Sequence, residues 1–173
     1  MKTLLLLTLM LSPLVLVDFS NDPETSRWYI VDDGVMGGRS QGNFSITKKG
    51  VAVFEGTVSL ENNGGFSSLR YRLPKTQEIT QKSAKLYLKG DGKNYQFRIK
   101  RSSRDYHSYI FDFQTSGEWE EVIVPLEKMY PAFRGRNLAM EDYPADQIEE
   151  ITFLIGNKKP ESFRLEISKI ELF

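Results

Sequence analysis

The sequence predicts an all-β protein whose antiparallel strands form a β-sandwich or jelly roll. Between residues 95 and 100, apolar side chains occupy odd positions and polar ones even positions, and residues 108–114 show a similar alternation. A period of two indicates strands with one buried side and one solvent-facing side. Turn-forming residues separate such segments, and no stretch sustains a helical period. This pattern favours two antiparallel sheets packed face to face, with a closed barrel as the alternative.

The strand-like segments follow one another along the whole chain. They are residues 51–60, 66–73, 84–89, 95–100, 108–114, 120–126, 148–155 and 162–173. In the last segment the apolar positions change from odd to even after Ile167, which predicts a β-bulge near Ser168 and Lys169. Residues 74–83 and 129–147 form two long connections, and we expect each to be functional or to cover a sheet edge.

Composition limits the classes of partner and cofactor. A chain of 173 residues with 40% hydrophobic residues is long enough for one domain with a core. Lys and Arg total 23, as do Asp and Glu, so the net charge gives no indication of nucleic-acid binding. The absence of cysteine excludes disulfides, thiolate zinc sites and cysteine nucleophiles.

Residues 1–13 differ from the rest and resemble a leader. Lys2 is followed by a short apolar run, as in a secretory signal, although no small-residue cleavage site follows it. We therefore predict a signal peptide or an uncleaved membrane anchor, and a domain spanning residues 14–173. An exported or anchored location in the periplasm or envelope is favoured. The alternative is a cytoplasmic chain in which these residues extend a first strand.

Two loops rich in glycine and short polar residues are the most distinctive part of the sequence. The first glycine loop is residues 33–40, Asp-Gly-Val-Met-Gly-Gly-Arg-Ser, and the second is residues 62–68, Asn-Asn-Gly-Gly-Phe-Ser-Ser. Glycine allows positive φ and close backbone approach. No helix follows either glycine pair, which excludes a dinucleotide-binding turn. We expect both loops to let strands turn sharply or cross closely, with Met36 and Phe66 as apolar plugs.

Catalytic and metal-binding groups are scarce. His107 is the only histidine and lies in a polar connection, where we expect a solvated side chain rather than the base of a triad. A hard cation such as calcium could use only oxygen ligands. The candidate oxygen ligands are Asp32, Asp33, Glu61, Asp91 and Asp105. Such side chains commonly stabilise turns, so we predict no metal site but leave a structural calcium open. Because catalytic groups are scarce, we also predict no enzyme activity and no cofactor.

Carbohydrate binding is the main chemical alternative to protein binding. Sandwich domains bind sugars by stacking them on exposed aromatic rings while polar side chains bond the hydroxyls. The chain has eight tyrosines and two tryptophans, but both Trp28 and Trp119 adjoin strand segments, and we predict them to lie in the core.

Four arginines near the loops and the long connection are candidates for a partner surface. They are Arg39, Arg70, Arg134 and Arg136. The planar guanidinium binds carboxylates and stacks on rings, which favours arginine at interfaces. The alternative is that they are internal pins paired with Asp33 or Glu61.

Long motifs resemble the complex I intermediate-associated protein 30 family. The resemblance rests on Trp28 with residues 32–40, on residues 54–70 and 90–95, on Trp119 with Val124-Pro125, and on residues 133–136 and 163–167. It covers the chain from about Leu16 to the end. The resemblance implies a galactose-binding-like jelly roll and a chaperone-like factor that assembles respiratory complex I by binding subunits. Other relatives carry the domain beside a nucleotide-binding domain, which this chain lacks.

The sequence as a whole predicts a non-enzymatic binding domain that holds a protein partner, such as subunits of a respiratory or envelope complex. A carbohydrate-binding module of the cell envelope is the alternative, and the leader, if uncleaved, is the one expected membrane contact. The residues predicted to form the partner-binding face or its structural frame are Asp33, Gly34, Met36, Gly37, Gly38, Arg39, Ser40, Asn63, Gly64, Gly65, Phe66, Arg70, Arg134 and Arg136.

Overall fold

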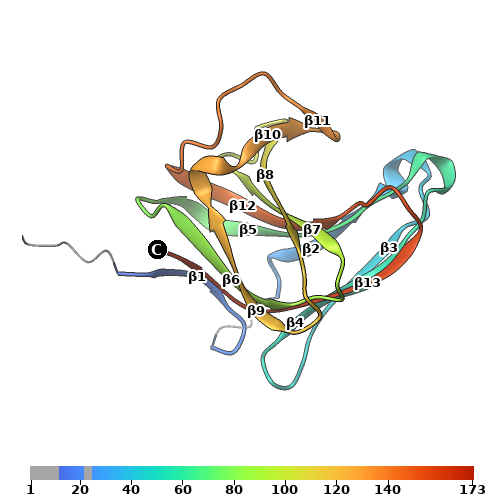
Figure 1. The fold of residues 1–173 in the computed structure, drawn as a ribbon, viewed down its shortest axis with the longest axis horizontal. Helices are drawn as coiled ribbons and strands as arrows, with labels where there is room; N and C mark the ends of the chain where they lie inside the picture. Colours follow the sequence, from blue (N-terminus) through green and yellow to red (C-terminus); the bar gives the residue numbers. More distant parts are fainter. Residues whose placement is uncertain (1–11, 22–24) are drawn as a thin grey trace, which may run out of the picture.

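Two antiparallel sheets pack face to face in the computed structural model, which describes residues 12–21 and 25–173 (Figure 1). The six-stranded sheet has the order β3 (Gln41–Ile46), β4 (Ala52–Val58), β13 (Glu161–Leu172), β6 (Ser83–Lys89) and β9 (Trp119–Pro125), with β1 (Leu14–Asp18) also paired to β13. The seven-stranded sheet has the order β11 (Arg136–Asn137), β10 (Tyr130–Phe133), β8 (Ser108–Gln114), β7 (Asn94–Lys100), β12 (Gln147–Ile155), β5 (Ser67–Glu78) and β2 (Trp28–Asp32). The predicted all-β sandwich is confirmed.

The core lies between the sheets and follows the alternation in the sequence. Leu86 and Leu88 of β6 and Leu165 of β13 face Phe97 of β7 and Phe153 of β12, and all are fully buried. Three short 3-10 helices, η1 (Asp33–Met36), η2 (Glu61–Asn63) and η3 (Leu126–Lys128), lie in connections. No helix in the described part of the chain is long and apolar enough to cross a membrane.

The predicted bulge in the last strand is confirmed. The pairing of β13 with β6 shifts register between Ile167 and Lys169, so that Ile167 and Ile170 both remain buried. Beyond the shift β13 also pairs with β1, while β4 pairs with its first half. One long strand thereby holds two partners along the same edge.

The two tryptophans have different positions, and the prediction for Trp119 is wrong. Trp28 is buried and stacks on Phe44 and Tyr71, with ring centroids 5.7 and 4.7 Å apart. Trp119 is 48% exposed, because it begins β9, the edge strand of the six-stranded sheet, and lies opposite Lys89 rather than facing the core.

Both long connections contain strands that the sequence pattern did not indicate. Residues 74–78 continue β5, and Gln77 and Glu78 pair with β12. Pro74 is tolerated because the pairing with β12 skips from Arg72 to Gln77, where no donor is needed. Residues 130–137 form the β10–β11 hairpin, which adds an edge to the sheet. Of the leader predicted for residues 1–13, all but Ser12 and Pro13 lies outside the described residues.

Candidate functional site

The Asp33 carboxylate joins the two glycine loops. It accepts hydrogen bonds from the Ser40 amide at 3.1 Å and the Ser40 hydroxyl at 2.5 Å. From the second loop it accepts the amides of Gly65 at 2.6 Å and Phe66 at 3.3 Å. Asp33 and Ser40 are both buried. This carboxylate therefore points inward and acts as a clamp between the end of β2 and the start of β5.

Two glycines leave the space that this carboxylate fills. A Cβ at Gly38 would lie 2.2 Å from Asp33 Oδ1, and one at Gly64 would lie 2.6 Å from Asp33 Oδ2 and 2.9 Å from the Ser59 carbonyl oxygen. A side chain at either glycine would overlap these oxygen atoms. Gly37 serves a different purpose, since it ends η1 in the left-handed region at φ 85°. We expected close approach at these loops, and the atoms that approach Gly38 and Gly64 are the Asp33 carboxylate oxygens and the Ser59 carbonyl oxygen.

Further contacts join the loops at the surface. Asn62 donates from its amide nitrogen to the Gly37 carbonyl oxygen at 2.9 Å. Arg39 pairs with Glu61 at 2.9 Å, and both side chains are more than 60% exposed. Asn63 is exposed and has φ 59°. The side chain of Met36, predicted to be a plug, lies outside the described part of the chain.

The environment of Asp33 favours its charged form. Removal from water raises the pKa of the carboxyl, but the hydrogen bonds from Ser40, Gly65 and Phe66 outweigh this effect and lower the pKa below its ordinary value. The clamp is therefore an ionised carboxylate at neutral pH, and it requires no metal ion to balance its charge.

The other predicted arginines do not join the loops. Arg70 lies in β5, where its Nε donates to Ser68 Oγ at 3.3 Å. Arg134 and Arg136 are exposed in the β10–β11 hairpin, and the Arg134 guanidinium lies 5.2 Å from the centre of the Phe133 ring. Because β11 and β2 are opposite edges of the seven-stranded sheet, the hairpin and the glycine loops flank that sheet from two sides.

Between these flanks lies the outer face, the side of the seven-stranded sheet that points away from the six-stranded one. Strand register aligns one row of its side chains across six strands. The row is Tyr29, Arg70, Thr152, Arg98, Ile110 and Tyr130. Thr152 and Ile110 are buried although they lie outside the core cluster. The longer side chains beside them therefore cover the middle of this face.

Charged groups on the outer face are held by specific contacts. Glu150 of β12 is 4% exposed, accepts the Tyr29 hydroxyl at 2.8 Å and lies 3.9 Å from both Arg70 and Arg72. Burial and this hydrogen bond raise the pKa of Tyr29.

A second polar cluster occupies the β7, β8 and β10 side of the outer face. Asp112 accepts the Gln96 amide at 2.7 Å and the Tyr130 hydroxyl at 2.5 Å. Burial first, and then the bond to Asp112, raise the pKa of Tyr130 to about 12. Both clusters keep their tyrosines neutral as hydrogen-bond donors.

A pocket of about 380 Å³ opens at one end of the outer face. It is lined by Gln96, Asp112, Leu154 and Asn157, among others. A Cβ placed at Gly156, also in the lining, would lie 3.4 Å from Phe66 Cβ and 3.3 Å from Leu154 Cδ2. Phe66 thus lies next to the pocket, in a position set by the Asp33 clamp.

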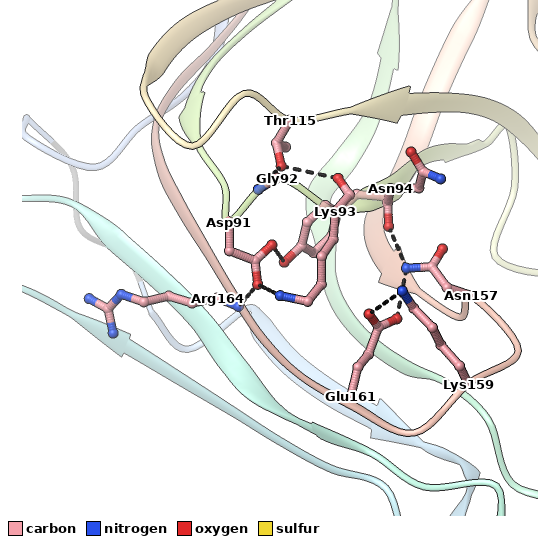
Figure 2. A network of polar contacts seen from close by, with 10 residues as sticks. Asp91, Gly92, Lys93, Asn94, Thr115, Asn157, Lys159, Glu161 and Arg164 are labelled. Carbon is pink, nitrogen blue, oxygen red and sulfur yellow. Dashed lines mark hydrogen bonds and ion pairs between the residues drawn. The ribbon is translucent and has the colours of Figure 1, made fainter.

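A network of polar contacts fixes the rim of the pocket (Figure 2). Asp91 accepts bonds from the Lys93 ammonium at 2.6 Å, the Tyr95 hydroxyl at 3.0 Å and the Arg164 amide at 3.0 Å. Burial and the Asp91 charge raise the pKa of Tyr95. These contacts tie the connection between β6 and β7 to β13.

The rest of this network holds the neighbouring connections. Asn157 donates to the Asn94 carbonyl oxygen at 3.1 Å and to Glu161 at 2.8 Å, and Lys159 lies 3.5 Å from Glu161. Thr115 accepts the Gly92 amide and donates to the Lys93 carbonyl oxygen, both at 3.0 Å. Polar contacts therefore hold the connections at residues 90–93 and 156–160 to their neighbours and to Glu161 and the Arg164 amide of β13.

The candidate acids and the histidine occupy structural positions. Asp91 is held by an ammonium group, and within residues 12–21 and 25–173 no three acidic or imidazole side chains gather as a metal site. His107 is buried rather than solvated as predicted, because it packs edge-on against the rings of Tyr106 and Tyr109, each 5.2 Å away. In the described part of the chain neither of its ring nitrogens has a hydrogen-bond partner, so no triad is assembled around it.

The comparisons with known proteins decide the family. The family model described as complex I intermediate-associated protein 30 matches residues 17–167. This chain belongs to that family. The mitochondrial complex I intermediate-associated protein 30 of Mus musculus is 25% identical over 183 residues, which covers 92% of this chain and 56% of the mouse protein. The chain therefore spans just over half the length of that relative.

Solved structures share the fold. The family 11 carbohydrate-binding module of the cellulase Lic26A-Cel5E of Clostridium thermocellum superposes with a TM-score of 0.68 at 15% identity, over 93% of this chain and 94% of that chain. The module from the same organism in complex with a β-1,3-1,4-mixed-linked tetrasaccharide gives 0.65 at 16% identity, over 93% and 95%. At this identity the likeness shows the fold alone, a galactose-binding-like jelly roll.

The outer face supplies the residues that sequence reasoning missed. Tyr29, Arg98, Asp112, Tyr130 and Glu150 come from five strands that are distant in sequence. The signal that was present is the polar side of the strand alternation, since Arg98 and Asp112 occupy its even positions. Their convergence became visible only with strand order and register.

The space around Asp33 predicts a contrast between two glycines of the first loop. Gly38→Ala should lower the free energy of unfolding by about 2 kcal/mol or more, because its Cβ overlaps the Asp33 carboxylate. Gly34→Ala should change it by less than about 0.5 kcal/mol, since a Cβ there meets nothing within 4 Å. Urea unfolding of both variants measures the difference. Equal effects would show that the glycines are not required by packing.

The lowered pKa of Asp33 predicts pH-dependent stabilisation. A carboxyl whose folded-state pKa lies below its unfolded value of about 3.9 stabilises fully at higher pH, and this contribution is lost as the pH falls through the folded-state pKa. Asp33→Asn should therefore cost about 2 to 4 kcal/mol at pH 7, and less below about pH 4. Urea unfolding at pH 7, 5, 4 and 3 tests this. A cost that stays constant down to pH 3 would contradict it.

Proposed function

We propose that this domain is a non-catalytic protein-binding module that acts in the assembly of a multi-subunit complex, and that its outer face holds the partner. The observation that carries the proposal is the row of tyrosines and arginines across the seven-stranded sheet, with Glu150 and Asp112 fixed among them. Tyrosine and arginine are the residues that carry most binding energy in protein interfaces. The printed name of the mouse relative, an intermediate-associated protein of complex I, supports the same class of function.

The flanks of the sheet support this assignment. The glycine loops border one edge of the outer face, and the β10–β11 hairpin with exposed Arg134 and Arg136 borders the other. A partner seated on the face would contact both. The loops act as a rigid frame for this surface, because their buried carboxylate, Asp33, is fully engaged in internal hydrogen bonds.

Carbohydrate binding is the second candidate, and the exposed ring of Tyr29 beside Arg70 on the outer face favours it. Sugars stack on such rings and bond to charged neighbours. Tryptophan quenching would not detect this binding, since Trp28 is buried in the core and Trp119 lies on the other sheet. Calorimetric titration with a mixed-linked tetrasaccharide is the suitable measurement, and absence of heat would remove this candidate.

We also propose that residues 1–13 direct export of the protein or anchor it to a membrane. Cell fractionation followed by N-terminal sequencing of the purified chain separates a cleaved leader, an anchor and a cytoplasmic chain.

A photoreactive phenylalanine placed in vivo at Tyr29 should form a discrete adduct with one protein or a small set of subunits. Tyr29 is 38% exposed on the outer face, and the aromatic replacement is similar in size. The matched control is the same replacement at Trp119, which is 48% exposed on the opposite sheet and should give no such adduct. Mass spectrometry identifies the products. The proposal fails if Tyr29 gives no protein adduct or if both positions give the same products.

A further inference from the structure

The outer face carries more cationic than acidic side chains, and the acidic ones are already engaged. Arg70, Arg72, Arg98 and Lys100 share the face with Glu150 and Asp112, and Glu149 at the register shift of β12 also attracts Arg72. Asp112 accepts bonds from Gln96 and Tyr130, while Glu150 accepts the Tyr29 hydroxyl. The face therefore has positive charge that its own carboxylates do not neutralise, although the whole chain is neutral.

Arg70 and Arg98 stand on either side of the central strand. Register places Thr152 of β12 directly between them, so their backbones lie about 10 Å apart, two strand spacings. Their guanidinium groups turn toward Ser68 and Gln96, which register places on either side of Leu154. Two forked donors at this spacing can approach one ligand from both sides.

Both guanidinium groups are oriented by neutral partners. The side-chain oxygen of Gln96 accepts hydrogen bonds from Arg98 Nε, at 3.0 Å, and from Arg98 Nη2. Arg70 donates to Ser68 Oγ, and its closest carboxylate oxygen, on Glu150, is 3.9 Å away. For Arg98, no carboxylate of residues 12–21 and 25–173 lies within 4.0 Å. Among the described residues neither arginine donates a hydrogen bond to a carboxylate, although Arg70 forms an ion pair with Glu150 at 3.9 Å and Asp112 attracts Arg98 from further away.

Burial and a neighbouring cation dominate the electrostatic environment of Arg98, and Tyr130 and Asp112 offset them only in part. Burial, followed by the positive charge of Arg70, lowers the pKa of Arg98 to about 10. A ligand carboxylate between the two groups would offset their mutual repulsion. A doubly charged phosphate fits less well, because Asp112 and Glu150 border the same space and repel it more strongly than a single negative charge.

We propose that Arg70 and Arg98 bind a side-chain carboxylate of an acidic, extended segment of the protein partner, across β12 on the outer face. This inference rests on the proposed protein-binding function and specifies the chemistry that it recognises. Charge complementarity identifies the occupant: the face offers paired guanidinium groups, and aspartate or glutamate is the protein group that matches their fork bidentately.

The test uses the whole chain and a fluorescein-labelled peptide of six glutamates alternating with serines, with glutamine in place of glutamate in the control peptide. Fluorescence anisotropy should show binding of the acidic peptide only. Arg98→Gln and Arg70→Gln should each weaken binding by at least about tenfold, as expected for a lost charge-assisted contact. Arg98→Lys should weaken it less, since the charge stays while the fork is lost.

The control variant is Arg164→Gln, which removes the same charge from the opposite sheet, where Arg164 pairs with Glu55 and Glu166. Its affinity for the peptide should stay within about twofold of the parent protein. Melting temperatures of all variants confirm folding, and the two separate arginine variants guard against one that fails to fold. Equal weakening by Arg164→Gln, or equal binding of the glutamine peptide, would overturn the carboxylate site.

The photo-adduct at Tyr29 separates this inference from the proposed function. If the adduct forms equally in a chain that also carries Arg70→Gln and Arg98→Gln, the partner binds the outer face but the arginines are not its carboxylate site. If the adduct is lost in that chain while the parent protein forms it, the carboxylate site is supported within the native complex.

Discussion

The ionised carboxylate of Asp33 is the interaction on which the arrangement of the seven-stranded sheet depends. Asp33 lies in the first glycine loop and binds donors from that loop and from the second, some 25 to 33 residues further along the chain. It therefore fixes where β2 ends and where β5 begins. The bonds are charge-assisted and buried, which makes them stronger than neutral ones and costly to leave unmade. The glycines at 38 and 64 follow from this carboxylate, because any side chain there would occupy its space.

The clamp also determines what the outer face presents. By fixing β5 against β2 it sets Arg70 opposite Tyr29, and by fixing Phe66 it places that residue behind Gly156, which lines the pocket. The centre of this face is covered by its own long side chains, so that Glu150 and Thr152 are nearly inaccessible although they point away from the core. The polar network around Asp91 holds the far rim in the same way. Two separate polar anchors therefore give this surface a fixed shape before any partner arrives.

Sequence reasoning reached the fold because period two and turn residues are local properties. Alternation located β7 and β8, and the change of phase after Ile167 located the bulge. It did not reach the β10–β11 hairpin, whose strands are short, or the extension of β5 past Pro74, which is permitted by a gap in pairing that only the partner strand reveals. Trp119 was assigned to the core because its neighbours are apolar, whereas its exposure comes from the edge position of β9. For the candidate site, the glycine loops were visible as a motif, but Arg98, Asp112 and Glu150 come together only through strand order.

The charges of the outer face are better explained by recognition than by stability. Enclosing a carboxylate among arginines costs desolvation that the ion pairs seldom repay, and an apolar set of similar volume would stabilise a sheet at least as well. The distances agree with this view, since Glu150 lies 3.9 Å from Arg70 and Arg72, beyond hydrogen-bond range, and takes its one close contact from the Tyr29 hydroxyl. The side chain of Gln96 orients Arg98 and is itself held by Asp112. Two residues therefore position one guanidinium group, which donates to no other described group on this face. Positioning of this kind is what pre-organised binding sites require, because donors that are already fixed lose little entropy when the ligand arrives. On the opposite sheet Arg164 is paired directly with Glu55 and Glu166, as a solvent-exposed structural arginine usually is. This difference between the arginines is what the proposed recognition of a carboxylate on the outer face requires.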